Sequence, residues 1–185
     1  QKTSRVNMLE DMEKNMEGYT GSVRAVMREA KRGSLRGIHG ALSQLISVPE
    51  QYAVAIETAF GAALQNIVTD SEGDAKRAIQ FLKETKGGRA TFLPLSAVRG
   101  RMLEERGLAQ CDGFVAVASD LVKCDATYEA VVKAQVGRTA VAEDMDCAIA
   151  IARKFSYRFR IVTLDGQIIN AGGSMTGGSR MQNAG

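Results

Sequence analysis

Hydrophobic residues in the first part of the chain recur at alternating steps of three and four, with charged residues between them. This spacing places them along one face of a helix, as in a coiled coil. The run is shorter than three heptads, and Gly18 and Gly21 interrupt it. We predict a helix over residues 1–30, with residues 1–32 forming the end of a coiled-coil arm. The pattern consists of Leu9, Met12, Met16, Tyr19, Val23 and Val26.

A mixed helix and strand pattern follows over residues 48–95. Pro49 is predicted to open a helix, because the missing N–H costs nothing at the first helical position. The short apolar stretch of residues 66–70 predicts a strand. Ser71 and Asp74 then have the spacing of a capping box for a second helix, which ends before Gly87 and Gly88. "RATFLPL" (residues 89–95) predicts the next strand. The second helix is expected to bury Ala75, Ala78, Ile79 and Leu82.

Residues 125–170 repeat this order. Tyr128 precedes Gly137 by nine residues, just as Tyr52 precedes Gly61. "RTAVAED" then predicts a strand, Asp144 a helix cap, and "FRIVTLDG" a strand that pairs with "QIINA" as a hairpin. The helix between these strands is predicted to bury Ala148, Ile151, Ala152 and Phe155.

The repeated order predicts an α/β (α+β) fold with two related lobes. We place lobe one at about residues 33–98 and lobe two at about residues 125–179. The connector, about residues 99–124, is expected to contribute a strand at "FVAVA", and a helix is predicted over residues 97–110, across its start. Residues 180–185 are expected to be the start of a returning arm or a disordered tail.

Candidate chemistry is sparse. His39 is the single histidine of the chain, and no nucleophile motif accompanies it, so a structural or exposed role is expected. Cys111, Cys124 and Cys147 are too widely spaced for a zinc site, and their odd number without a secretory signal predicts reduced thiols. No apolar run is long enough to cross a membrane. We expect a cytoplasmic protein without metal or cofactor, and a piece of something longer because it lacks an initiator methionine.

The segment "NAGGSMTGGSR" (residues 170–180) resembles a phosphate-binding loop, but Gly178 stands where that loop needs its lysine. Three interpretations are open: a nucleotide-binding enzyme domain, a flexible tail, or a surface where another backbone comes close. Glycine suits the last, because it has no Cβ and tolerates positive φ. The cluster contains Gly172, Gly173, Gly177 and Gly178.

Basic residues form three groups, and a formal net charge of +3 makes ordinary solvated charge the default interpretation of each. The first group, Arg28, Lys31, Arg32 and Arg36, follows the heptads, and Arg180 is expected to lie near it. The other two are Arg153, Lys154, Arg158 and Arg160, and Lys83, Lys86 and Arg89.

Three segments, in order, carry a family resemblance: residues 35–70, "GGRATFLPL", and "YRFRIVTLDGQIINAGGSMTGG". Together they resemble the hinge domain of bacterial SMC (structural maintenance of chromosomes) proteins, over most of the chain. The resemblance implies a non-catalytic homodimer, toroidal in shape, that joins two coiled-coil arms of an ATPase whose heads lie elsewhere.

The resemblance also assigns residues. It implies that Gly172, Gly173, Gly177 and Gly178 lie at the dimer interface. Hinges contact DNA near the arm junction, which favours Arg28, Lys31, Arg32, Arg36 and Arg180 for weak, sequence-independent binding. The parent is implied to act in chromosome condensation and segregation at the nucleoid, with accessory condensin subunits. A purely structural dimerisation module without DNA binding is the alternative.

Overall fold

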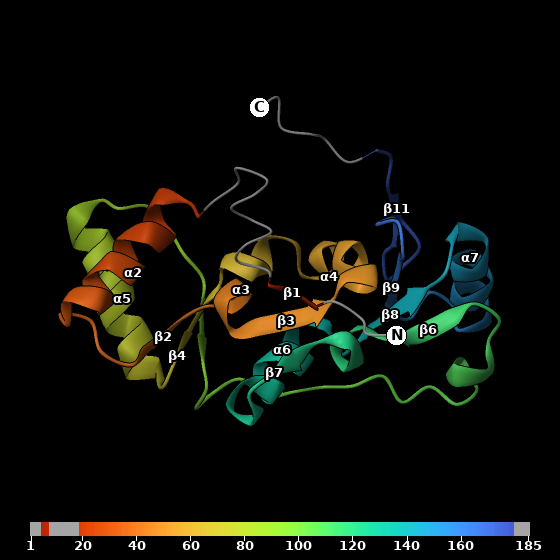
Figure 1. Ribbon diagram of the computed structural model, residues 1–185, viewed down its shortest axis with the longest axis horizontal. Coiled ribbons are helices and arrows are strands. Elements are labelled where there is room, and N and C mark those ends of the chain that lie inside the picture. Colours follow the sequence, from red (N-terminus) through yellow and green to blue (C-terminus); the bar gives the residue numbers. More distant parts are fainter. Residues whose placement is uncertain (1–4, 8–18, 180–185) are drawn as a thin grey trace.

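Small β-sheets follow one another along the long axis of the molecule in the computed structural model, which describes residues 5–7 and 19–179 (Figure 1). Their strand orders are β2-β4-β5 at one end, β1-β3-β7 in the middle and β11-β10-β9-β8-β6 at the other end. The strands are β1 (Arg5–Asn7), β2 (Ile38–Ala41), β3 (Ile46–Pro49), β4 (Ile67–Thr69), β5 (Phe92–Pro94), β6 (Phe114–Val117), β7 (Lys123–Cys124), β8 (Thr139–Ala142), β9 (Arg160–Thr163), β10 (Ile168–Ile169) and β11 (Met175–Thr176).

Helix α5 (Glu72–Thr85) connects the parallel strands β4 and β5. It begins with the predicted capping box: Ser71 accepts a hydrogen bond from the amide of Asp74, and the Asp74 carboxylate reaches back to the Ser71 amide. Helix α2 (Gly21–Arg32) packs against α5 and buries Val23 and Val26. A parallel strand pair needs such a crossover connection, which explains the helix between the strands.

The same unit recurs at the other end. Helix α7 (Met145–Lys154) connects the parallel strands β8 and β9, and Asp144 caps it by accepting from the amide of Cys147. Strands β10 and β11 extend this sheet as antiparallel neighbours, and β6 pairs with the other side of β8. The predicted hairpin between "FRIVTLDG" and "QIINA" is therefore confirmed.

Two further helices occupy the middle of the molecule, and a tyrosine directly precedes each of them. Helix α4 (Ala53–Phe60) follows a 3-10 turn that ends at Tyr52, and α6 (Glu129–Val136) follows one that ends at Tyr128. The two tyrosines share one backbone conformation, φ −108° and ψ 4° against φ −103° and ψ 2°. The equal Tyr-to-Gly spacing thus marks a repeated structural unit. The remaining short helices are α3 (Leu42–Leu45) and the 3-10 turns Glu50–Tyr52, Gly61–Gln65, Leu108–Gln110, Ala118–Leu121 and Ala126–Tyr128.

The molecule has two halves, one around the sheet β2-β4-β5 and one around the sheet β11-β10-β9-β8-β6. Each of these two helices contacts the half to which it does not belong in sequence. Helix α4 lies against β9, and Val54 and Thr58 approach Gly166 in the turn before β10. Helix α6, from the second half, reaches the first sheet through a bond between Tyr128 and His39. One apolar cluster therefore combines α4, α6, β3, β4 and β9 and joins the halves.

Four local predictions are wrong. Arg5–Asn7 forms a strand paired with β3, rather than the start of a helix. Residues 97–110 contain only the turn Leu108–Gln110, because Gly100 packs against α6 and Gly107 is left-handed with φ +86°. Ile79 is exposed rather than buried. Pro49 ends β3 and precedes a 3-10 turn that leads into α4, so it is not the first residue of that helix. The heptad positions Leu9, Met12 and Met16 lie outside the described residues.

Candidate functional site

The glycine cluster forms the tip and outer strand of a hairpin. Gly172 and Gly173 make the turn between β10 and β11 with φ values of +90° and +108°, which L side chains rarely adopt. Asn170 closes the turn, because its carbonyl accepts from the Gly173 amide at 2.9 Å and its amide donates to the Ser174 carbonyl at 2.7 Å. These two glycines are therefore required by the turn itself.

The second glycine pair is held by Gln167. The Gly178 amide donates to the Gln167 Oε1 at 2.7 Å, and the Gln167 Nε2 donates to the Gly178 carbonyl at 3.0 Å. A Cβ at Gly177 would stand 2.1 Å from that Oε1 atom. The cluster is thus a clamped hairpin strand, which differs from the strand, loop and helix of a phosphate-binding site.

Strand β11 lies at the edge of its sheet, and Met175 on it is 55% exposed. Strand β5 forms the corresponding edge of the first sheet, and Ile79 on the neighbouring helix α5 is 51% exposed. Ile79 lines a hollow of about 350 Å³ together with Leu82, Lys83, Gly88, Arg89 and Ala90, directly before β5. Each half therefore combines an open strand edge with an exposed apolar side chain. Helix α5 and strand β11 lie toward opposite ends of the molecule (Figure 1).

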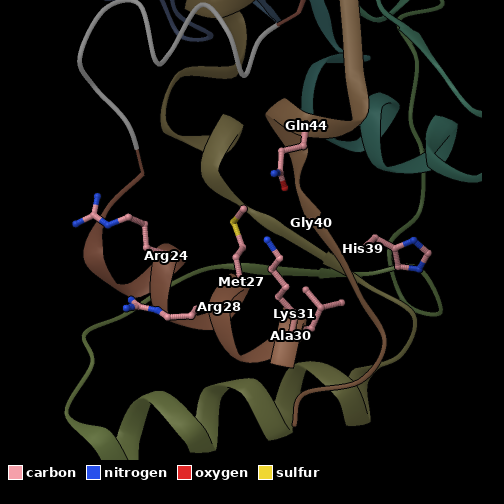
Figure 2. A pocket seen from close by; sticks show the side chains of 9 residues that line it. Arg24, Met27, Arg28, Ala30, Lys31, His39, Gly40 and Gln44 are labelled. Atoms are coloured by element: carbon pink, nitrogen blue, oxygen red, sulfur yellow. The ribbon is translucent and has the colours of Figure 1, made fainter. Parts of the chain in front are cut away.

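The predicted DNA-contacting residues of α2 lie beside a groove of about 730 Å³. Lys31 rises from α2 toward Gln44, whereas Arg24 and Arg28 extend outward from the helix (Figure 2). Arg24, Arg28 and Lys31 follow one another at steps of four and three residues, so they share a helix face. The sequence interpretation missed Arg24, although its spacing from Arg28 could have indicated it. The groove is lined by Arg24, Met27, Arg28, Ala30, Lys31, Ile38, His39, Gly40 and Gln44.

The other members of the first basic group differ in their ion pairs. Arg32 pairs with Glu29 at 3.0 Å, which offsets part of its charge. Arg36 is exposed beyond the end of the helix. Arg180 lies outside the described residues, so its expected place near this group stays a prediction. Arg28, Lys31 and Arg36 are the members whose side chains make no ion pair within the described part of the chain.

The second basic group is largely engaged in the fold. Arg158 pairs with Glu105 at 2.6 Å, and Arg160 donates to the carbonyl of Ala59. Burial lowers the pKa of Arg160. Arg158 thus binds the connector, and Arg160 binds α4 of the first half. Because both guanidinium groups are already engaged, α2 is favoured over the second group as a polyanion surface.

His39 has two partners that the sequence did not reveal. Its Nδ1 lies 2.7 Å from the Tyr128 hydroxyl and its Nε2 lies 2.6 Å from Asp70. The His39 and Tyr128 rings also meet edge to face, with centroids 5.4 Å apart. Burial, together with the nearby carboxylates of Asp125 and Asp70, raises the pKa of Tyr128. The histidine is therefore a polar link between the two halves.

The three cysteines are free thiols, and burial raises the pKa of Cys124, which disfavours its reactive thiolate. Among residues 5–7 and 19–179, no three His, Cys, Asp or Glu side chains gather as a metal site. No helix within these residues is long and apolar enough to cross a membrane.

Residues 35–152 match the model of the flexible hinge domain of SMC proteins. The chain belongs to this SMC hinge domain family. It is 43% identical to the chromosome partition protein Smc of Bacillus subtilis over 97% of its length. It spans only about 15% of that relative, and of the relative from Halothermothrix orenii, to which it is 40% identical.

Solved hinge structures share the fold. A hinge domain from Geobacillus stearothermophilus, described as an asymmetric dimer, matches with a TM-score of 0.85 and 44% identity, covering 94% of this chain and 71% of that one. The hinge domain of the Pyrococcus furiosus SMC protein matches with a TM-score of 0.74 and 30% identity, covering 94% and 87%. The predicted family and mixed α/β fold are therefore confirmed.

Proposed function

We propose that two copies of this chain form a ring through two equivalent contacts, each joining the first half of one copy to the second half of the other. The open edges of β5 and β11, each with an exposed apolar side chain, support this arrangement. A two-fold axis repeats one heterologous contact twice and closes the assembly. The second contact forms within an already joined pair, so it adds avidity.

In this arrangement Met175 of one copy lies at the hollow beside Ile79 of the other. Edge strands readily accept another strand, and the short β11 can extend the partner's sheet at β5. Gly172, Gly173, Gly177 and Gly178 lie in or beside that edge, where the absence of side chains lets two backbones approach. Within the longer protein, the dimer joins two coiled-coil arms of a chromosome-partitioning ATPase.

The dimer is tested with Met175→Glu and Ile79→Glu, which change side chains without altering the glycine backbone. Either substitution places a carboxylate in both contacts of the ring. We therefore expect largely monomeric protein in sedimentation at micromolar concentration. The matched control is Glu84→Lys, an exposed position roughly 140° around α5 from Ile79, which should stay dimeric. If both variants are folded and fully dimeric, the assigned edges are wrong.

We also propose that α2 and the residues after it contact DNA without sequence preference, mainly through Arg28, Lys31 and Arg36. Arg24 lies on the same helix face, and Arg32 and Arg180 are further contributors. The main support for this proposal is the exposed row Arg24, Arg28 and Lys31 beside the groove. Phosphate contacts give binding that weakens with salt, with a slope of about 0.9 per contacted phosphate in log–log form. A dimer presents two such rows.

The test is fluorescence anisotropy with duplex DNA at several salt concentrations. We expect Arg28→Glu with Lys31→Glu to weaken binding and to reduce the salt slope, while scrambled DNA competes as well as any chosen sequence. Arg99→Glu with Arg101→Glu makes the same change in net charge at exposed connector positions and should have a smaller effect. Equal losses in both double variants would show that only net charge matters and that α2 is not the contact surface. A wild type that shows no salt-dependent binding would leave the purely structural module as the better description.

A further inference from the structure

Three helices of the molecule end with the same pair of backbone hydrogen bonds. At the end of α7, the Tyr157 amide donates to the Ala152 carbonyl at 2.9 Å and the Ser156 amide donates to the Arg153 carbonyl at 3.2 Å. Helices α2 and α5 end in the same way, with Gly33 and Lys86 as the left-handed residue that this motif requires. Ser156 takes that place in α7, with φ +57°.

Helix α7 differs from the other two in its next residue. Tyr157 is also left-handed, with φ +58°. A bulky residue in this conformation is an outlier that costs free energy. The helix ending does not demand it, because Ser34 and Gly87 at the same place after α2 and α5 have no positive φ. The conformation of Tyr157 therefore needs a cause outside α7.

Tyr157 packs partly against the apolar cluster of the second half, and it also contacts the glycine hairpin. The Tyr157 carbonyl accepts a hydrogen bond from the Gly172 amide at 2.8 Å. The Tyr157 ring stands against the next glycine, with its Cδ1 atom 3.7 Å from the point that a Cβ of Gly173 would occupy. The left-handed backbone thus lets one residue contact both glycines of the turn, with its carbonyl on the first and its ring on the second.

We propose that Tyr157 is a positioning residue for the self-association edge: it fixes the turn at Gly172 and Gly173 and thereby sets where β11 stands. This proposal rests on the ring dimer proposed above. The chain of contacts is short, because β11 begins at Met175, two residues after Gly173. The Tyr157 hydroxyl makes no hydrogen bond to any residue that the structure describes, so the ring and the backbone carry the effect.

The proposal is tested by sedimentation equilibrium on three variants. Tyr157→Gly keeps the left-handed backbone without strain but removes the ring, and we expect self-association to weaken by about 3- to 10-fold. Tyr157→Phe keeps the ring and should dimerise as the wild type does. Ser156→Gly is the matched control at the neighbouring position, and it should also leave the affinity unchanged. If Tyr157→Gly is folded and associates as tightly as the wild type, the proposal is overturned.

A second test, by NMR, does not depend on whether Tyr157→Gly folds. In the wild type, the ring should displace the NMR signals of the Gly173 α-protons, and Tyr157→Phe should preserve the displacement. Normal Gly173 shifts in the wild type would overturn the proposal. A wild type that is monomeric would instead overturn the ring dimer, and with it any role of Tyr157 in self-association.

Discussion

The two β–α–β units, β4–α5–β5 and β8–α7–β9, share a plan but continue differently. Each has parallel strands, a polar cap at the start of its helix and a left-handed residue at the end. The first stops at β5, which remains a sheet edge, whereas the second adds β10 and β11. The repeated unit therefore provides the framework, and the segments around it provide the surfaces that differ.

Gly61 and Gly137 occupy equivalent positions after α4 and α6, but each position favours glycine for a different physical reason. Gly61 follows α4 with φ +55° and ψ −134°, a conformation that side chains disfavour, but it has open space around it. Gly137 follows α6 with an ordinary helical backbone, φ −70° and ψ −16°. A Cβ there would stand 1.8 Å from the carbonyl oxygen of Arg101 in the connector.

The largest effect is expected from Gly137→Ala. The new methyl group has to displace the connector backbone. This displacement also breaks the hydrogen bond from the Leu103 amide to the Gly137 carbonyl. We expect a loss of about 3 kcal/mol in the free energy of unfolding, and a fall in Tm of about 2–4 °C per kcal/mol for a chain of this size.

Gly61→Ala separates backbone strain from steric overlap with a neighbour. It should destabilise through backbone strain, by about 1–3 kcal/mol, with no displacement of neighbours. Thermal unfolding measures both losses, and the NMR signals of residues 100–103 should move only in Gly137→Ala. Unchanged connector signals in that variant would contradict the steric explanation.

The two helix-opening tyrosines give a second, smaller contrast. The Tyr128 hydroxyl bonds to His39 at 2.7 Å, whereas the hydroxyl of Tyr52 makes no hydrogen bond to a described residue. Tyr128→Phe should therefore cost about 0.5–1.5 kcal/mol, and Tyr52→Phe should be close to neutral. Urea unfolding of the pair measures the difference. Equal losses would show that the bond across the halves contributes nothing to stability.

Local signals in the sequence predicted much of this fold. The Ser71 and Asp74 capping box, the Asp144 cap and the equal Tyr-to-Gly spacing each concern residues within one element, so their spacing carries the information. Short apolar segments also predicted β4, β5, β6, β8, β9 and β10, whereas β1, β2, β3, β7 and β11 were not predicted. Three ordered segments, which include "GRATFLPL" and the glycine cluster, indicated the family.

The errors have physical causes that spacing does not carry. The exchange of α4 and α6 between halves and the bond from His39 to Tyr128 join residues far apart in the chain. Ile79 lies next to the buried stripe, where periodicity cannot separate a core position from an exposed one. Residues 97–110 have helical periodicity, but the packing of Gly100 against α6 overrides it.

The smallest expected contrast concerns the two helix caps in acid. Hydrogen bonds from Ser71, together with Arg77, lower the pKa of Asp74, and the bond from the Cys147 amide lowers the pKa of Asp144. A carboxyl group with a lowered pKa in the folded state stabilises it at pH values above about 3.9, the usual value for aspartate. That contribution is lost as the pH falls through the lowered pKa.

We therefore expect the wild-type Tm to fall as the pH is lowered from about 6 to about 2, and asparagine at either cap to make the fall shallower. Asp74→Asn should flatten the curve more than Asp144→Asn. Asp74 is buried and bound by the Ser71 amide, the Ser71 hydroxyl and Arg77, whereas Asp144 is exposed and is held by backbone amides and the Cys147 thiol. Asparagine keeps the shape of each cap, so the comparison isolates the charge. An equal or larger flattening by Asp144→Asn would show that the burial and extra donors at Asp74 do not strengthen its ionised form, and that the two caps respond to acid as one repeated unit.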